Sequence, residues 1–237
     1  MTQLQQILDN NPLLHGEAQG KLTSWQLSEE VLSFIDKNVQ QNHRTLEIGA
    51  GVSTILFGAK SSIHTCITPS ENQVTRIETY CENNQISTEK IDFKIGFSEK
   101  ILPSLETHQL DLILIDGSHA FPLPFLDWFY SYQKLKLGGK LIIDDTQLWT
   151  GKVLKQFLCL EPEWKFNVNS PPRSAIFTKV KNYNRTKWHN QQPYLVKHSH
   201  LSILNAKLKM LWQFLLQGEF GKLGKLINEK IKAWKIR

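Results

Sequence analysis

The chain has 237 residues, of which 41% are hydrophobic, and this suits one α/β domain with an appendage better than two equal domains. Its net charge of +6 is uneven, because residues 1–178 hold 15 basic and 20 acidic side chains whereas residues 179–237 hold 13 and 2. No apolar run approaches the roughly 20 residues of a membrane span, and the N-terminus lacks a signal-peptide pattern. We therefore expect a soluble cytoplasmic protein with a basic C-terminal segment.

The cysteines Cys66, Cys81 and Cys159 are odd in number and widely separated. They form neither a C-x-x-C pair nor a cluster with histidines. This pattern predicts reduced thiols in the cytoplasm and gives no indication of zinc.

The first forty residues are predicted to be helical. Their apolar side chains, such as Trp25, Val31 and Ile35, recur at a spacing that fits a helix face better than a strand. We expect residues 1–40 to form a helical cover over one side of a ligand crevice, with Trp25 packed in the core or, alternatively, near the ligand.

From residue 44 strand and helix patterns alternate with short connections, which predicts a parallel sheet with helices on both faces. Two later runs, 164–169 and 174–180, are separated by Ser-Pro-Pro-Arg and predict an antiparallel pair. The fold class is therefore α/β, a Rossmann-like, doubly wound, mostly parallel sheet that ends in an antiparallel hairpin. Strands are expected near 44–48, 63–67, 91–95, 110–116 and 139–144, and helices near 52–60, 71–85, 98–105, 122–135 and 151–160.

A glycine-bearing turn follows the strand at 44–48. Gly49 and Gly51 allow a sharp turn and a close approach to a ligand, and Ser53 and Thr54 are candidates to cap the next helix. Glu47 closes the strand two residues before the first glycine, where its carboxylate would repel a pyrophosphate but suit a cationic ligand. An ordinary strand-to-helix turn is the alternative interpretation.

The E-x-G-x-G pattern at Glu47, Gly49 and Gly51 resembles the first motif of the class I methyltransferases. This resemblance covers about residues 20–180 and implies that S-adenosylmethionine, rather than NAD, binds at the turn. By the same resemblance, Ser53 and the loop at Asp116 are expected to bind the cofactor. Ser98, in G-F-S-E-K after the third strand, resembles the segment that frames the adenine.

The ribose site departs from the family pattern. The second strand of these enzymes ends in an acidic residue, but here Thr68 stands at its end and Glu71 follows one helical step later. We expect Thr68 or Glu71 to take that place. The Ser70–Gln73 pair beside them is predicted to form a capping box.

Three carboxylates follow the fourth and fifth parallel strands, at Asp116, Asp144 and Asp145. The carboxyl ends of parallel strands meet at one rim, so these side chains would repel each other unless a cation lay between them. Mg²⁺ or a similar hard divalent ion is the simplest such cation. Alternatively, Asp144 and Asp145 cap the next helix and Asp116 only touches the cofactor.

The segments I-D-G-S-H and I-I-D-D-T-Q-L-W-T-G resemble the metal-dependent catechol and caffeoyl-coenzyme A O-methyltransferases and the macrocin-type enzymes. By that resemblance Asp116, Asp144 and Asp145 are metal ligands, with Asp145 where the catechol enzymes carry asparagine. His119, three residues after Asp116, is a candidate general base. Asp116 and His119 are thus the expected catalytic residues.

The function expected for residues 1–180 is S-adenosylmethionine-dependent methylation of a hydroxyl on a small molecule or glycan, assisted by the metal. A non-catalytic cofactor-binding or scaffold protein is the alternative, because fold alone does not settle function. Nothing in the sequence identifies the acceptor.

Residues 181–237 are predicted to form a basic, amphipathic helical extension broken near Gly218 and Gly221. Three roles remain open for it: a packing or homodimerisation arm, contact with the inner membrane surface, and binding to nucleic acid. Nucleic acid is the least expected partner, because the Asn/Asp-Pro-Pro-aromatic motif of amino-methylating enzymes is absent after the fourth strand.

Overall fold

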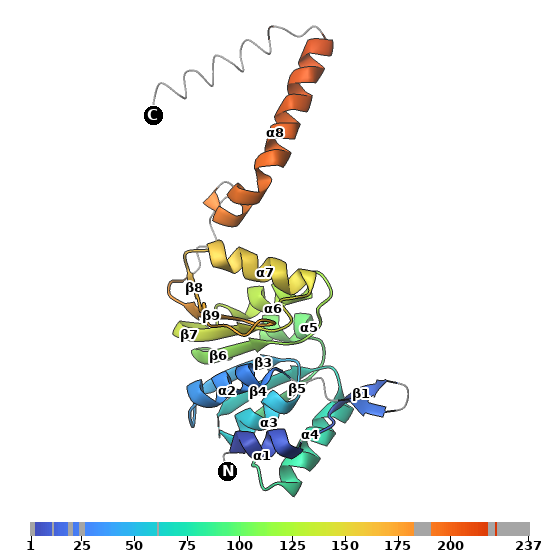
Figure 1. Ribbon diagram of the computed structural model, residues 1–237, viewed down its shortest axis with the longest axis vertical. Coiled ribbons are helices and arrows are strands. Elements are labelled where there is room, and N and C mark those ends of the chain that lie inside the picture. Colours follow the sequence, from blue (N-terminus) through green and yellow to red (C-terminus); the bar gives the residue numbers. More distant parts are fainter. Residues whose placement is uncertain are drawn as a thin grey trace. The chain divides into compact units, whose positions relative to one another are not determined.

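A computed structural model describes residues 3–10, 12–18, 21–23, 27–60, 62–182, 191–217 and 221. The chain divides into two compact units, Met1–Asn184 and Arg185–Arg237. The first unit is an α/β domain (Figure 1) and the second contains the long helix α8, Pro193–Leu216.

Seven strands of the described chain form one sheet in the order β5-β4-β3-β6-β7-β9-β8. The first five of these are parallel, and β9 pairs antiparallel with both β7 and β8. The Rossmann-like sheet with a terminal antiparallel hairpin is thereby confirmed. The strands are β3 Arg44–Ile48, β4 Ile63–Thr68, β5 Ile91–Ile95, β6 Leu110–Ile115, β7 Leu135–Ile143, β8 Trp164–Phe166 and β9 Ala175–Lys179.

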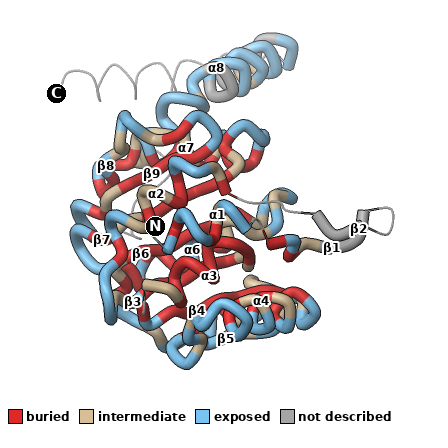
Figure 2. Tube along the Cα trace, turned by 60° about the horizontal axis from the view of Figure 1, so that its bottom comes forward, coloured by how far each residue is buried: buried red, intermediate tan, exposed pale blue. Residues whose placement is uncertain are grey.

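Helices cover the sheet in two groups. The first group packs together around α3, and the second packs around α6. Because side chains alternate along a strand, Leu112, Leu114 and Ile142 share one face and join the first group in a continuous core (Figure 2). The first group comprises α1 Gln3–Asn10, α2 Glu29–Asn38, α3 Val52–Ala59 and α4 Glu71–Asn83; the second comprises α5 Ser98–Ile101 with the short 3₁₀ turn Leu102–Ser104, α6 Leu123–Ser131 and α7 Trp149–Leu160.

The N-terminal segment is only partly helical, so the expectation for residues 1–40 was wrong in its middle. Between α1 and α2 lies a small antiparallel hairpin of β1, His15–Ala18, and β2, Lys21–Thr23. Gly16 and Gly20 explain the error, because each glycine costs a helix about 1 kcal/mol relative to alanine. Trp25 lies outside the described residues.

Two element boundaries also differ from the prediction. The strand expected at 139–144 begins earlier, at Leu135, and α6 ends at Ser131 instead of continuing to 135. Gly138, with φ of 81°, lies inside β7.

The extension is helical over Pro193–Leu216, within the range 181–237 for which helix was predicted. The break expected near Gly218 falls outside the described residues. No described helix is both long enough and apolar enough to cross a membrane.

The core of the first unit contains a carboxyl group, that of Asp127 on α6, which is fully buried. Burial raises the pKa of Asp127 to about 6; the Ser98 hydroxyl opposes this shift and the Glu99 carboxylate adds to it. A raised folded pKa means that the folded state holds the proton more tightly than the unfolded state does. Stability therefore falls as the pH rises from about 4 to about 6.

We expect the Asp127→Asn variant to lose this dependence. Two pKa units correspond to about 3 kcal/mol of unfolding free energy, an upper bound for the effect. Urea unfolding at a series of pH values measures it, and a wild-type curve that stays level from pH 4 to 7 would contradict the interpretation.

Asp111→Asn is the matched control. Burial alone would raise the pKa of Asp111, but hydrogen bonds from the Lys136 side chain and the Arg44 backbone N–H outweigh burial and lower it. Because a lowered folded pKa stabilises the charged form, this variant should lose stability at neutral pH and match the wild type in acid.

Candidate active site

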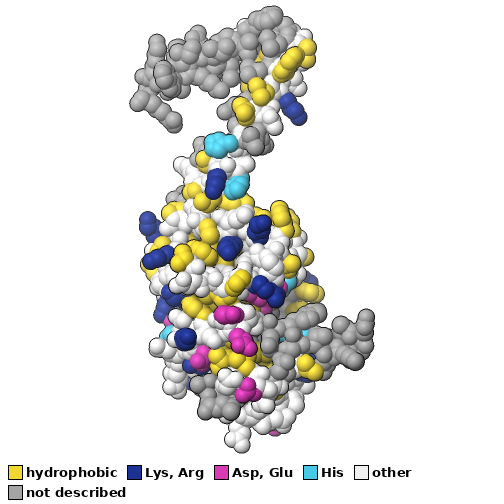
Figure 3. Space-filling view, viewed as in Figure 1, with side chains coloured by type: hydrophobic (Ala, Val, Ile, Leu, Met, Phe, Trp, Pro, Cys, Tyr) yellow, Lys and Arg dark blue, Asp and Glu magenta, His cyan; other side chains and the backbone are white. Residues whose placement is uncertain are grey.

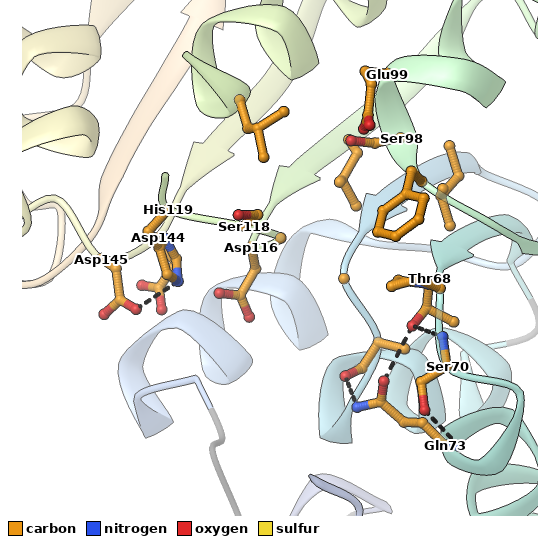
Figure 4. A pocket seen from close by; sticks show the side chains of 18 of the residues that line it. Thr68, Ser70, Gln73, Ser98, Glu99, Asp116, Ser118, His119, Asp144 and Asp145 are labelled. Atoms are coloured by element: carbon orange, nitrogen blue, oxygen red, sulfur yellow. Dashed lines mark hydrogen bonds and ion pairs between the residues drawn. The ribbon is translucent and has the colours of Figure 1, made fainter. Parts of the chain in front are cut away.

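A pocket of about 750 Å³ opens at the carboxyl ends of the parallel strands. It lies where open α/β sheets bind ligands, and its volume is typical of a small-molecule site. Figure 4 shows its two sides, with Asp116, His119, Asp144 and Asp145 on one and Thr68, Ser70 and Gln73 on the other.

The glycine turn brings the backbones of β3 and β6 together at the pocket floor. Gly49 has φ of 106°, and a Cβ on it would lie 2.2 Å from the carbonyl oxygen of Asp116. Its N–H donates to the carbonyl of Ile67, and the N–H of Asp116 donates to the carbonyl of Ile48. Glycine is therefore required at this position by both conformation and space.

Glu47 lies beneath the turn rather than in the pocket wall. Its buried carboxylate accepts hydrogen bonds from the hydroxyls of Ser53 and Thr54, the latter at 2.6 Å. The Thr54 hydroxyl also accepts the N–H of Gly51, at 3.0 Å, which confirms Thr54 as a cap of α3. The Ser53 hydroxyl donates to the Glu47 carboxylate and does not cap the helix.

His64 is a third partner of Glu47. Its Nε2 lies 3.3 Å from the carboxylate, its Nδ1 lies 2.8 Å from the hydroxyl of Thr45, and its ring stacks on Phe57. His64 is buried, with 1% of its surface exposed. Nothing in its position near the start of β4 distinguished an inward from an outward side chain.

The predicted capping box at α4 is half formed. The Ser70 hydroxyl accepts the N–H of Gln73, but the Gln73 side chain turns to the pocket and donates to the carbonyl of Ala50 at 2.7 Å. Thr68 lies beside it, with its hydroxyl 3.1 Å from Oε1 of Gln73. Thr68 thus lines the pocket as expected, whereas Glu71 is exposed and is not a lining residue.

Ser98 also lines the pocket, together with its neighbours Phe97 and Glu99. The segment leaves β5 through Gly96, whose φ is 151°, and enters α5 at Ser98. The Phe97 ring is 56% exposed and thus offers an apolar surface beside a polar one. This pairing suits a flat heteroaromatic ring.

The acidic rim is electrostatically strained. Burial, followed by the charges of Asp144 and Glu47, raises the pKa of Asp116 well above its usual range. Burial also raises the pKa of Asp144, although its carboxylate accepts a hydrogen bond from the Ser174 hydroxyl. The rim is therefore a place where a cation would be stabilised.

The two adjacent aspartates differ in their surroundings. Asp145 has a positive φ of 51°, and its carboxylate contacts Nε2 of His119 at 3.0 Å and the guanidinium of Arg173 at 2.7 Å. Burial would raise the pKa of Asp145, but hydrogen bonds from Arg173 and Gln147 and the charge of His119 lower it. Asp145 is thus paired directly with Arg173 and His119, whereas the charge of Arg173 only partly offsets the raised pKa of Asp116.

Among the described residues, ligand atoms of Asp116, His119 and Asp145 lie within 4.8 Å of one another. Asp144 is not a member of this group, although it lines the same pocket. The chain therefore gathers a carboxylate–imidazole–carboxylate set where three carboxylates were predicted.

Two pocket residues were missed from the sequence. His15, in β1, lines the pocket and lies 3.2 Å from the carbonyl of Ala50. Arg173 comes from the link between β8 and β9. Neither belongs to a recognisable motif, and the Ser-Pro-Pro-Arg link was identified only as a turn.

Two exposed aromatic side chains follow the acidic residues in the sequence. Phe121 follows His119 by two residues and is 68% exposed, and Trp149 follows Asp145 by four residues and is 67% exposed. Their ring centroids are 6.2 Å apart. Neither residue is among those that line the pocket.

Residues 46–146 match a family model described as a methyltransferase domain. A search of curated proteins found no match. A proposed caffeoyl-CoA O-methyltransferase from Staphylococcus aureus is similar in structure, with a TM-score of 0.59, 16% identity, and 76% of this chain and 93% of that one covered.

Two further structures show how widely this fold is used. An rRNA methylase from Streptococcus thermophilus has a TM-score of 0.51 at 14% identity, covering 64% of this chain and 95% of its own. A proposed methyltransferase from Streptococcus mutans in complex with SAH has a TM-score of 0.51 at 13% identity, covering 65% and 100%.

Residues 46–146 thus match a methyltransferase-domain model, and the sheet of the first unit has the Rossmann-like order. Similar structures include an RNA enzyme and a proposed small-molecule enzyme, so the fold does not determine the acceptor.

Proposed function

We propose that the protein is an S-adenosylmethionine-dependent O-methyltransferase. The observation that carries the proposal is a glycine turn at the floor of a pocket whose rim carries acidic side chains. The turn supplies a close backbone approach for a nucleotide-like ligand, and the carboxylates favour the positive charge of a sulfonium and an amino group.

The two sides of the pocket suit different parts of that cofactor. Phe97 and Ser98 offer an apolar ring and a hydroxyl to the adenine, and Thr68 and Gln73 offer polar groups to the ribose. Gln73 takes the place in which Glu71 was expected. The methionine portion of the cofactor then lies toward Gly49 and Asp116, where the backbones of β3 and β6 approach each other most closely.

We expect Gly49→Ala to lose binding of S-adenosylhomocysteine, because its Cβ would strike the Asp116 carbonyl. Gly138→Ala is the control, since Gly138 also has positive φ, 81°, but has no atom within 4 Å of the added Cβ. Isothermal titration calorimetry of both folded variants measures the effect. Wild-type affinity in Gly49→Ala would contradict the assigned cofactor position.

A divalent metal fits the residues of the rim. Asp116 and Asp145, whose carboxylate oxygens lie in one group with the His119 imidazole, would hold Mg²⁺ or Mn²⁺, while His119 keeps its nitrogens for proton transfer. Such an ion, when bound, lowers the pKa of a hydroxyl and orients it. Arg173 occupies one side of Asp145, so it would compete for that carboxylate.

The chain's own residues then divide the work of methyl transfer. Asp145 fixes the imidazole of His119 by accepting a hydrogen bond from its Nε2, which leaves Nδ1 as the acceptor for a proton. In the proposed reaction, the acceptor oxygen forms a bond to the methyl carbon as the carbon–sulfur bond breaks, and His119 takes the hydroxyl proton. The products are a methyl ether and S-adenosylhomocysteine.

His119→Ala should lower kcat by roughly 10²–10⁴, the usual contribution of a general base, and leave S-adenosylhomocysteine binding unchanged. His108→Ala is a matched control, because His108 is exposed and does not line the pocket. The assay is methyl transfer to a panel of phenols and sugars. An unaltered kcat in His119→Ala would remove the histidine from the mechanism.

Metal dependence is tested separately. Activity should be lost in excess EDTA and restored by Mg²⁺ or Mn²⁺, and Asp145→Asn should weaken that restoration because it removes a charged ligand. Full activity of both the wild type and Asp145→Asn in EDTA would remove the metal from the proposal and keep the methyltransferase.

The rival function is a cofactor-binding protein without turnover. Binding of S-adenosylhomocysteine without methyl transfer to any phenol or sugar would favour it.

A further inference from the structure

The helix α8 presents an exposed apolar ridge. Leu204, Leu208, Trp212 and Leu216 recur at intervals of four and are 52%, 47%, 63% and 77% exposed. Residues four apart lie on one side of a helix, so these side chains form a row. Hydrophobic side chains on this helix are in view in Figure 3.

The same helix is positively charged. Residues 191–217 contain three lysines and two histidines but no aspartate or glutamate. Lys197 and Lys209 are exposed, and Lys209 lines a groove beside the ridge with Leu208 and Trp212. The exposed apolar row on this helix therefore has exposed cationic side chains beside it.

We propose that α8 binds the surface of an anionic lipid membrane. Its Leu and Trp side chains would enter the boundary between headgroups and acyl chains, and its lysines would contact the acidic headgroups. A tryptophan is well suited to that boundary, since its ring is apolar and its N–H is polar. A helix of this length, about 36 Å, would lie along the surface.

Charge complementarity distinguishes this occupant from two others. A second copy of the chain would bring the same positive charge against the ridge, and like charges across an interface are costly. A nucleic acid would satisfy the lysines but would cover the leucines with a phosphate backbone that has no apolar counterpart. Only an anionic lipid surface satisfies both kinds of side chain.

The test uses the full-length protein with vesicles of phosphatidylcholine, alone or mixed with phosphatidylglycerol. We expect co-sedimentation with the mixed vesicles only, and its loss near 1 M salt, where charges are screened beyond about 3 Å. Absence of binding to the mixed vesicles at low salt would overturn the proposal.

Point variants assign the binding to α8. The Lys197→Gln, Lys209→Gln double variant should bind about 30-fold more weakly, at about five-fold for each lysine. Lys152→Gln with Lys165→Gln, two exposed lysines of the first unit, is the charge-matched control. An equal loss in the control would show that binding follows overall charge and would overturn the assignment.

The ridge has its own control. Leu208→Ala with Trp212→Ala should reduce vesicle binding at least about ten-fold, whereas Trp149→Ala removes an equally exposed tryptophan of the first unit and should leave it intact. Unchanged binding in the ridge variant would contradict insertion. If analytical ultracentrifugation showed instead that the ridge variant abolishes a dimer, without vesicle binding by the wild type, α8 would be a self-association arm.

Duplex DNA is included as the second anionic surface. Binding to DNA that depends on Lys197 and Lys209, with no binding to vesicles, would replace lipid by nucleic acid as the partner. Each of these experiments is independent of methyl transfer, so failure of the proposed reaction would leave this inference standing.

Discussion

The site depends on one buried carboxylate, that of Glu47. Its hydrogen bonds to Ser53 and Thr54 connect the end of β3 to the first turn of α3, and the contact with His64 connects it to β4. These bonds hold the glycine turn so close to β6 that no side chain fits at Gly49. A buried charge is stable only when such donors surround it, so the carboxylate and the turn require each other. The family resemblance made Glu47 a ligand-binding residue; in this structure it supports the turn.

The sheet could be predicted because its strands obey strong local rules. Buried parallel strands appear as short apolar runs, and a parallel order requires helical crossovers between them, so the acidic residues after β6 and β7 had to meet at one rim. The N-terminal hairpin could not be predicted in this way. β1 and β2 are four and three residues long, too short for a period to be visible, and they place His15 in the pocket through a contact 35 residues away.

The acidic pair shows where sequence reasoning reaches its limit. Asp144 and Asp145 are chemically identical neighbours, yet the positive φ of Asp145 directs them to different partners. Asp144 bonds Ser174, while Asp145 bonds His119 and Arg173. Positive φ is uncommon for residues other than glycine, and no residue pattern in the sequence predicts it at Asp145. Ser174 and Arg173 come from the antiparallel link about thirty residues later, and only the folded chain brings them to the rim with His119.

Arg173 and a bound cation are alternative solutions to the same electrostatic problem. The rim gathers three aspartates, and the guanidinium pairs with Asp145, while the pKa of Asp116 stays raised despite the charge of Arg173. The proposed cofactor and metal both bring positive charge to this rim. That charge would take over part of the stabilisation that Arg173 gives to the Asp145 carboxylate. Because Arg173 is exposed on a link between two strands, it can leave the rim without disturbing the core. Before ligands bind, Arg173 thus stabilises the acidic cluster. A metal that binds Asp145 must then displace Arg173 from that carboxylate.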